Sequence, residues 1–369
     1  MAPHRAADAA AADDETLIRI FDRFAAANPR LTRLWAKFVE WEATFPGASD
    51  FPWWGQPDDD DGDDENEPAE RDTLEDLFLV WPFSCLCMLH VAVFSPLAWD
   101  KFARHPGYPA ADGAPGAAWA GCERATFAVL ASLVLELAWW LANCVNYLVM
   151  AEPQLYARWA IGGAARRAPD DALLRKAAKD AAVGHALRPL LLWLAHPLYE
   201  WRAGAAFPFG DFPPLGVLAC HVAFAVALDD TLFYWLHRLL HHPRIYRHVH
   251  KQHHEFHHPV GLATEYAHPI EDLLCNTLST VAGPLLLGSH ASVVIGYASL
   301  KLWQSVDAHS GLLLPFSPWS VALLGMDCAR AHDFHHSHNS GNYGGFFMFW
   351  DWACGTDAAY KRHLRAKRD

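Results

Sequence analysis

The sequence has no Cys-x-x-Cys pair among its eight cysteines, and their positions do not match a disulfide framework. Several cysteines lie in apolar stretches, where a free thiol behaves as a small hydrophobic side chain. The first residues also lack the charged and apolar regions of a secretory signal peptide. We therefore expect a protein of a reducing compartment, without structural disulfides, that is targeted by internal apolar segments.

Charged residues are few, at 19% of the chain, and they are unevenly placed. Residues 1–75 hold 19 Asp and Glu against 7 Lys and Arg, a net charge of −12 out of −13 for the whole chain. The negative charges of residues 57–72 repel one another, so this segment is expected to stay unfolded. Residues 15–45 have apolar positions at helical spacing, which fits an amphipathic helix on a membrane surface or one packed on the main domain. The acidity thus belongs to an extension over residues 1–72 and says little about a substrate; no nucleic-acid partner is expected.

Four apolar stretches have the length of about 20 residues needed to cross a bilayer: residues 77–99, 125–151, 215–236 and 273–300. A shorter apolar stretch, residues 186–199, suggests an interfacial or re-entrant helix. A soluble helical protein with buried core helices is the alternative, which four such stretches disfavour. We predict an all-α, multi-pass membrane bundle with membrane helices in residues 73–214, a histidine-rich domain in 215–360 and a basic tail in 361–369.

Histidines, in contrast to the sparse charged residues, are concentrated in one region: 16 of the 23 lie between residues 237 and 338. They form three boxes, His237-Arg-Leu-Leu-His241-His242, His250-Lys-Gln-His253-His254 and His332-Asp-Phe-His335-His336. Neutral imidazole is the commonest side-chain metal ligand. Three boxes separated by apolar stretches therefore predict one polynuclear metal site.

Helical spacing predicts which imidazoles share an ion. Residues three or four apart share a helix face, so His237 with His241, His250 with His253, and His332 with His335 are expected to meet. The adjacent His254 and His336 are rotated by about 100° and would reach a second ion. With His268 and His309, these are more imidazoles than one tetrahedral ion uses, which predicts a dinuclear site. Imidazole suits Zn, Cu, Fe and Ni alike, so the pattern does not name the metal.

Metal-bound imidazoles usually donate their second N–H to an acceptor, often a carboxylate. The carboxylates placed to serve are Asp229, Asp230, Glu255, Glu265, Glu271, Asp307 and Asp333. His242 is a further candidate for this role, and carboxylates within an apolar stretch, as at Asp229-Asp230, generally have a function.

The run from Asp230 through the first two boxes resembles the fatty acid hydroxylase superfamily of membrane di-iron oxygenases. The segments Glu265-Tyr-Ala-His268-Pro-Ile-Glu271 and Asp307-Ala-His309-Ser-Gly311 are similar to its C-4 methylsterol oxidase branch. The third box, Gly341-Asn-Tyr343, Trp350-Asp351 and Gly355-Thr-Asp357 follow in the same order. The sequence departs from the branch at His257-His258, Ala331 and Cys354, and none of these departures removes a box histidine.

This resemblance implies two iron ions bound by the box histidines, with His268 and His309 as further ligands. It implies O2-dependent hydroxylation of an unactivated C–H bond, with electrons from NAD(P)H through a reductase and cytochrome b5. In the methylsterol branch a 4α-methyl group of a sterol is oxidised stepwise to a carboxylate, beside other enzymes of sterol C-4 demethylation. No general base or nucleophile is required beyond the metal ligands. The implied location is the endoplasmic reticulum membrane.

Topology follows from the basic residues around the boxes and at the C-terminus, since positive loops stay in the cytosol. Residues 273–300 would then cross and return as a hairpin between two cytosolic box regions. Two other functions stay open: another lipid oxygenase of the superfamily, such as a sterol C-5 desaturase or a lipid hydroxylase, and a non-enzymatic membrane protein that binds zinc.

Overall fold

The computed structural model describes residues 123–163, 166–203, 213–314, 317, 319 and 328–366. The acidic extension, its expected helix, the apolar stretch 77–99 and residues 367–369 lie outside the described residues. The described part is helical, and its only pairing of extended backbone is one isolated bridge between Ala160 and Leu312. The expected all-α class is therefore confirmed for this part.

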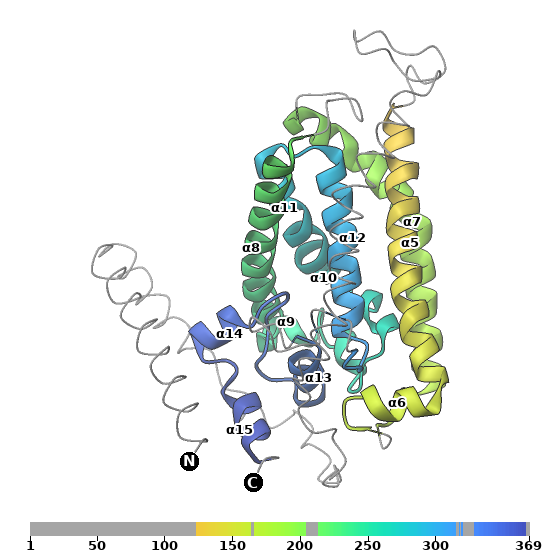
Figure 1. The fold of residues 1–369 in the computed structure, drawn as a ribbon, viewed down its shortest axis with the longest axis vertical. Helices are drawn as coiled ribbons and strands as arrows, with labels where there is room; N and C mark the ends of the chain where they lie inside the picture. Colours follow the sequence, from red (N-terminus) through yellow and green to blue (C-terminus); the bar gives the residue numbers. More distant parts are fainter. Residues whose placement is uncertain are drawn as a thin grey trace, which may run out of the picture. The chain divides into compact units, whose positions relative to one another are not determined.

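Two long helices form an antiparallel pair on one side of the described bundle (Figure 1). They are α5 (Glu123–Ala151) and α7 (Asp171–Ala203), and the short α6 (Pro153–Trp159) follows α5 in the connection between them. Trp139 and Ala142 of α5 pack with Ala181 of α7 in one apolar cluster. Residues 186–199 do not form a separate short helix as expected, because they belong to the 33-residue α7; an interfacial position stays a prediction. The first half of α7 is polar and gives no apolar signal, so the sequence showed only its second half.

The other side of the bundle contains α8 (Leu215–Leu240), α11 (Ser279–Leu287) and α12 (Ala291–Ala308). Helix α11 packs on α8, and α12 packs on α5, so α12 joins the two sides (Figure 1). Gly288, in the left-handed conformation, ends α11 and turns the chain back into α12. Residues 273–300 therefore form the expected hairpin, and not one continuous span.

Most of the short elements gather where α8 and α12 end, at the lower end in Figure 1, whereas α10 (Pro269–Glu271) and the π-helix η6 (Asp272–Leu278) lead into α11 inside the bundle. The elements that gather at the lower end are α9 (Pro243–Tyr246), η4 (His253–Glu255), η5 (Gly261–Glu265), α13 (Cys328–His338), α14 (Phe349–Cys354) and α15 (Ala358–Ala366). All three histidine boxes lie in this region, on α8, on the turn after α9 and on α13. Box two lies in a turn and a short 3-10 helix, and not on the α-helix that its spacing predicted.

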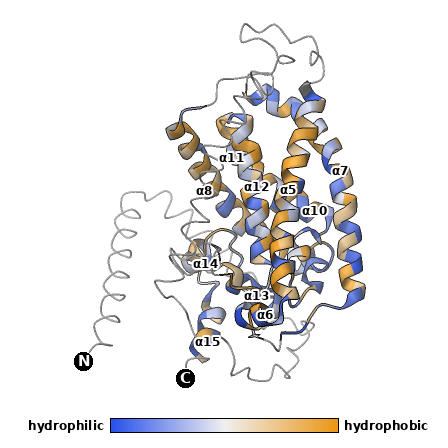
Figure 2. Ribbon diagram, turned by 45° about the vertical axis from the view of Figure 1, so that its right-hand side comes forward, coloured by the Kyte–Doolittle hydropathy of each residue, from blue (hydrophilic) through white to orange (hydrophobic). Residues whose placement is uncertain are grey.

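Two of the described helices, Arg124–Ala151 and Leu215–Leu240, are long and apolar enough to cross a bilayer. Hydrophobic residues dominate α5, whereas hydrophilic residues dominate α15 (Figure 2). Leu133, Leu137 and Trp140 form an exposed stripe on α5, with exposed fractions near 60%. Helix α7 has a similar stripe at Leu187, Leu191 and Leu194. An apolar face of this extent is typical of a surface that contacts lipid or another protein.

The backbones of α8 and α11 touch at Gly283. A Cβ atom built there would lie 2.7 Å from Ala225 Cα, a distance that no side-chain rotation relieves. We expect Gly283→Ala to lower the free energy of unfolding by about 1–3 kcal/mol, the usual cost of overpacking. Gly296→Ala on α12 is the matched control, since its Cβ would meet nothing within 4 Å. Thermal unfolding in lipid nanodiscs, followed by tryptophan fluorescence, compares the two; equal midpoints would contradict this packing.

Candidate metal centre

Nine histidines from four elements converge below α8 and α12. His237 and His241 come from the end of α8, and His309 directly follows α12. The turn around η4 and helix α13 supply the others, His250, His253, His254, His332, His335 and His336. Each of the nine is less than 9% exposed, although imidazole is a polar group. Such a concentration of buried imidazoles needs a compensating interaction.

The first group contains five imidazoles whose ligand atoms lie within 4.8 Å of one another: His237, His241, His250, His254 and His335. His250 Nε2 lies 3.0 Å from His241 Nε2 and 3.1 Å from His254 Nε2. His335 Nε2 lies 3.1 Å from His241 Nε2. The five Nε2 atoms therefore surround one small volume.

The second group contains four imidazoles that meet the same criterion: His253, His309, His332 and His336. His309 Nε2 is 2.9 Å from His332 Nε2 and 3.2 Å from His253 Nε2. The rings of His254 and His336 lie 4.7 Å apart between centroids, so the two groups adjoin. The arrangement provides two neighbouring sites.

The spacing argument proves partly right. Adjacent histidines belong to different groups, as expected. His254 and His335 lie in the first group, and their neighbours His253 and His336 lie in the second. The expected pairing of His250 with His253, and of His332 with His335, was wrong. Partners are four residues apart, since four residues on an α-helix turn about 40° past one full turn and three fall about 60° short. The backbone bond from His254 N–H to His250 O makes this relation hold even in the turn of box two.

Backbone carbonyls fix which ring nitrogen faces the centre. The Nδ1–H groups of His237, His335 and His336 donate to the carbonyls of Tyr343, Gly341 and Phe256, at 3.0, 2.6 and 2.9 Å. Those of His253 and His309 donate to the carbonyls of Tyr266 and Ser305, at 3.3 and 2.7 Å. With the proton on Nδ1, each Nε2 presents a lone pair.

Two facing lone pairs 3 Å apart repel each other, so the contacts between Nε2 atoms are not hydrogen bonds. A cation between them turns this repulsion into coordination. The carbonyls that accept the Nδ1–H groups complete the usual surroundings of a metal-bound histidine. The nine residues therefore fit two metal ions. Nothing in their type distinguishes iron from other ions that imidazole binds.

Burial also keeps these imidazoles neutral. It lowers the pKa of all eight that lie outside α8, to about 4 for His253 and about 3 for His335, with repulsion between neighbouring rings adding to the effect for most of them. A metal ion binds the neutral ring, so the site is in its ligating form at neutral pH without first losing protons.

Of the carboxylates expected to accept ring N–H groups, Glu271 is the one placed at a histidine of the two groups. Its Oε1 lies 2.9 Å from His250 Nδ1, and both side chains are buried. The pair joins α10 to box two. Glu271 is thus positioned to set the orientation of the His250 ring.

The remaining predicted residues have other partners in the structure. His268 and His242 cap α10 and α9, where their Nδ1 atoms accept N–H groups of Ile270 and Arg244. Asp230 accepts the N–H groups of Phe346 and Phe347, and Asp229 accepts the Tyr297 hydroxyl. The others bind side chains: Glu255 to Tyr266 and Lys176, Glu265 to Arg188 and His185, Asp307 to Ser317, and Asp333 to Arg166.

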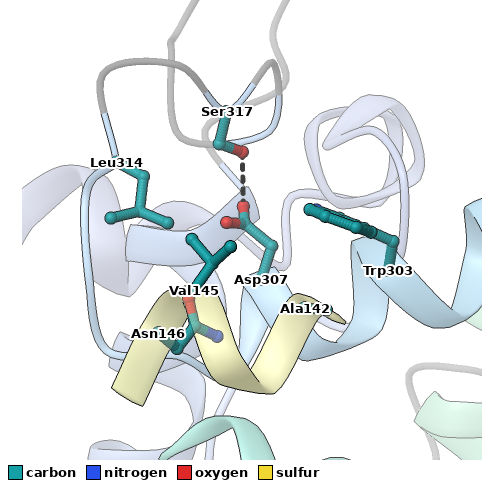
Figure 3. Close-up of a pocket in the computed structure, with 7 residues that line it drawn as sticks. All are labelled: Ala142, Val145, Asn146, Trp303, Asp307, Leu314 and Ser317. Atoms are coloured by element: carbon teal, nitrogen blue, oxygen red, sulfur yellow. Dashed lines mark hydrogen bonds between the residues drawn. The ribbon is translucent and has the colours of Figure 1, made fainter. Parts of the chain in front are cut away.

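Asp307 is an example of a predicted acceptor that binds another partner. It stands two residues before His309, yet its Oδ2 accepts the Ser317 hydroxyl at 2.6 Å (Figure 3). The bond closes one side of a small cavity that Val145 and Asn146 of α5 also line (Figure 3). Asp307 thus fixes the chain after α12.

Sequence reasoning missed the cations that bind these carboxylates. Arg166 forms an ion pair with Asp333 at 2.6 Å and donates to the Pro259 carbonyl at 2.9 Å, which joins box three to the loop after box two. On α7, Lys176 pairs with Glu255, Asp180 accepts from Gln252, and Arg188 pairs with Glu265. Helix α7 therefore holds the loop of box two without supplying a ligand. The distance along the chain hid these partners, since nothing in the sequence links residue 166 with 333.

These features define a helical protein with paired, buried histidine sites. Residues 222–356 match the family model described as fatty acid hydroxylase. Methylsterol monooxygenase 2-1 of Arabidopsis thaliana is 34% identical over 194 residues, which are 48% of this chain and 70% of the relative. The chain belongs to the fatty acid hydroxylase family, and its resemblance to methylsterol monooxygenases is confirmed.

Other relatives broaden the comparison. Methylsterol monooxygenase 1 of Rattus norvegicus is 40% identical over 162 residues, 44% of this chain and 52% of the relative. Very-long-chain aldehyde decarbonylase GL1-8 of Oryza sativa subsp. indica is 42% identical over 153 residues, 41% of this chain and 56% of the relative. The chain thus spans about half the length of these two relatives. No solved structure matches it.

Proposed function

We propose that this protein is a membrane di-iron oxygenase that oxidises the 4α-methyl group of a sterol stepwise to a carboxylate. The observation that carries the proposal is the pair of buried imidazole groups with their lone pairs turned inward. Family membership and the methylsterol monooxygenase relatives support the reaction class. We assign O2 as co-substrate and NAD(P)H, through a reductase and cytochrome b5, as the electron source.

The chain's own groups account for much of what this reaction needs. Iron, when bound, supplies the oxidising power to break an aliphatic C–H bond, for which proteins have no side chain. The nine imidazoles would hold it, the Tyr343 and Gly341 carbonyls orient two of the rings, and Glu271 orients a third. Burial keeps water away from the reacting groups. The apolar faces of α5 and α7 suit a protein that receives its substrate from a bilayer.

We further propose that the chain spans the membrane of the endoplasmic reticulum with the histidine boxes on the cytosolic side. Arg238, Arg244 and Arg247 around the first two boxes support this orientation, since basic loops stay cytosolic. The electron donors and the other sterol C-4 demethylation enzymes would then act at the same face.

A second candidate is suggested by the rice relatives, whose names describe very-long-chain aldehyde decarbonylases and whose identity to this chain is 42%. Under this alternative the same histidine groups would act on a long-chain aldehyde. The reading as a zinc-binding protein without enzymatic activity is disfavoured, since the chain belongs to a family of hydroxylases.

Expression in a yeast strain that lacks its own 4-methylsterol oxidase tests the proposal, with sterols and alkanes measured by mass spectrometry. We expect the accumulated 4,4-dimethylsterols to disappear with the wild-type chain and to persist with His335→Ala. Persistence with well-expressed wild-type protein would refute the sterol assignment. Conversion of a supplied long-chain aldehyde to an alkane would then favour the second candidate.

A further inference from the structure

Two buried charges face each other between α8 and α12, outside both histidine groups. Asp229 is fully buried and Lys301 is 4% exposed. Lys301 Nζ lies 3.8 Å from Asp229 Oδ1, beyond the 2.7–3.2 Å typical of a hydrogen bond. The other carboxylate oxygen, Oδ2, accepts the Tyr297 hydroxyl at 2.6 Å, whereas Oδ1 has no hydrogen-bond partner among the described residues.

The ammonium of Lys301 likewise lacks hydrogen bonds to the described residues. Its described contacts are this carboxylate and the rings of Phe233 and Phe346, whose centroids lie 4.5 and 4.6 Å away. None of these contacts is a hydrogen bond, although an ammonium offers three donors. Buried ion pairs generally need hydrogen bonds to offset the cost of leaving water. The pair therefore offers one acceptor and at least one donor to a group that the chain itself does not supply.

Geometry defines that group. An oxygen atom placed beside the pair can lie about 2.8 Å from both Nζ and Oδ1, because two sides of this length close a triangle on a base of 3.8 Å. The oxygen must accept from the ammonium and carry a proton for the carboxylate. A hydroxyl does both, whereas an aldehyde or ketone oxygen accepts only and would leave Asp229 Oδ1 without a partner.

The surroundings suit a lipid that reaches the metal centre. Asp229 and Lys301 stand eight residues, about 12 Å of helix, before His237 and His309 on the same helices. Phe233 connects the two places: its ring contacts the ammonium and lies 5.2 Å from the His237 ring. The backbone at Gly345 can lie close to the ammonium because glycine has no Cβ atom; a Cβ there would lie 3.2 Å from Lys301 Nζ.

We infer that Asp229 and Lys301 bind the hydroxyl group of the lipid substrate and thereby hold the lipid beside the histidine groups. The inference rests on the proposed function and deepens it, because a 4-methylsterol carries a hydroxyl group and a long-chain aldehyde does not. It also separates the two candidate substrates: the pair selects an alcohol over an aldehyde.

Equilibrium binding tests this without turnover. The full chain in nanodiscs, without electron donor, is titrated with a 4,4-dimethylsterol and with its methyl ether, and Kd is obtained from tryptophan fluorescence. The ether keeps the oxygen as an acceptor but loses the proton for Asp229. We expect the wild type to bind the free alcohol about 10-fold more tightly or better, since a hydrogen bond to a charged group is lost in the ether. Equal affinities in the wild type would overturn the inference whatever the variants do.

Two substitutions then locate the effect. Lys301→Met keeps most of the length of the side chain and removes its charge, and Asp229→Asn weakens the acceptor; both should bring the ratio of the two Kd values close to one. Lys176→Met, an exposed lysine, is the control and should leave the ratio unchanged. A variant that loses thermal stability but keeps the wild-type ratio would show a purely structural pair and overturn the inference. If neither sterol binds the wild type, the proposed substrate fails instead, and a long-chain primary alcohol with its methyl ether repeats the comparison.

Discussion

Replacing His335 by alanine is expected to lower turnover by more than about 100-fold and to reduce the bound metal from two ions per chain to one or none. His335 is fully buried, and its Nε2 lies 3.1 Å from that of His241 in the first group. Loss of a group that only orients a ligand costs about 10–100-fold, and loss of the ligand itself should exceed that. Metal per chain is measured by mass spectrometry of the purified protein, beside sterol turnover.

His253→Ala provides the same test for the second group, and His268→Ala is the control within the same loop. His268 lies in neither group, and its Nδ1 already accepts the N–H of Ile270. The control should therefore keep both ions. Full metal content in His335→Ala and His253→Ala would contradict the assignment of the two groups, and loss of metal in His268→Ala would return this residue to the ligand set.

The sequence predicted the centre well where the prediction depended on residue type and spacing. The boxes, the presence of two imidazole groups and the separation of His253 from His254 followed from imidazole chemistry and helical rotation. The choice between partners three and four residues apart was missed, because both spacings share a helix face, although four residues return closer to the starting direction than three do. His309 had no box around it and was found through the family resemblance.

The groups that orient the imidazoles were harder to predict. Every residue has a carbonyl, so nothing in the sequence distinguishes the carbonyls of Gly341 or Phe256 from the others. Carboxylates stand out in a sequence, and most of those named bind arginine, lysine or backbone N–H groups instead. The same limit applies to the fold: α7 was recognised only by its apolar half, while its polar half packs against the loop of box two through Lys176 and Asp180.

The loop after box three depends on a buried carboxylate, which leads to the second large effect. Asp351 is fully buried; its Oδ1 accepts from Tyr343 N–H and the Thr356 hydroxyl, and its Oδ2 accepts from Gly344 N–H. The same loop presents the Tyr343 and Gly341 carbonyls to His237 and His335. Asp351 therefore couples the stability of the loop to the orientation of two imidazoles in the first group.

Asp351→Asn should lower the free energy of unfolding by about 2–3 kcal/mol, because the new amide N–H₂ faces a donor and the charge-assisted bonds to the carboxylate are lost. Asp357→Asn is the matched control: its pair with the half-exposed Lys361 is worth less than about 1 kcal/mol. Denaturant unfolding of both variants measures the difference, and metal titration should show weaker binding for Asp351→Asn alone. Because His237 and His335 share their group with three other histidines, the loss should be confined to that group. Equal loss of metal from both groups would mean that Asp351 supports the whole fold and not the first site.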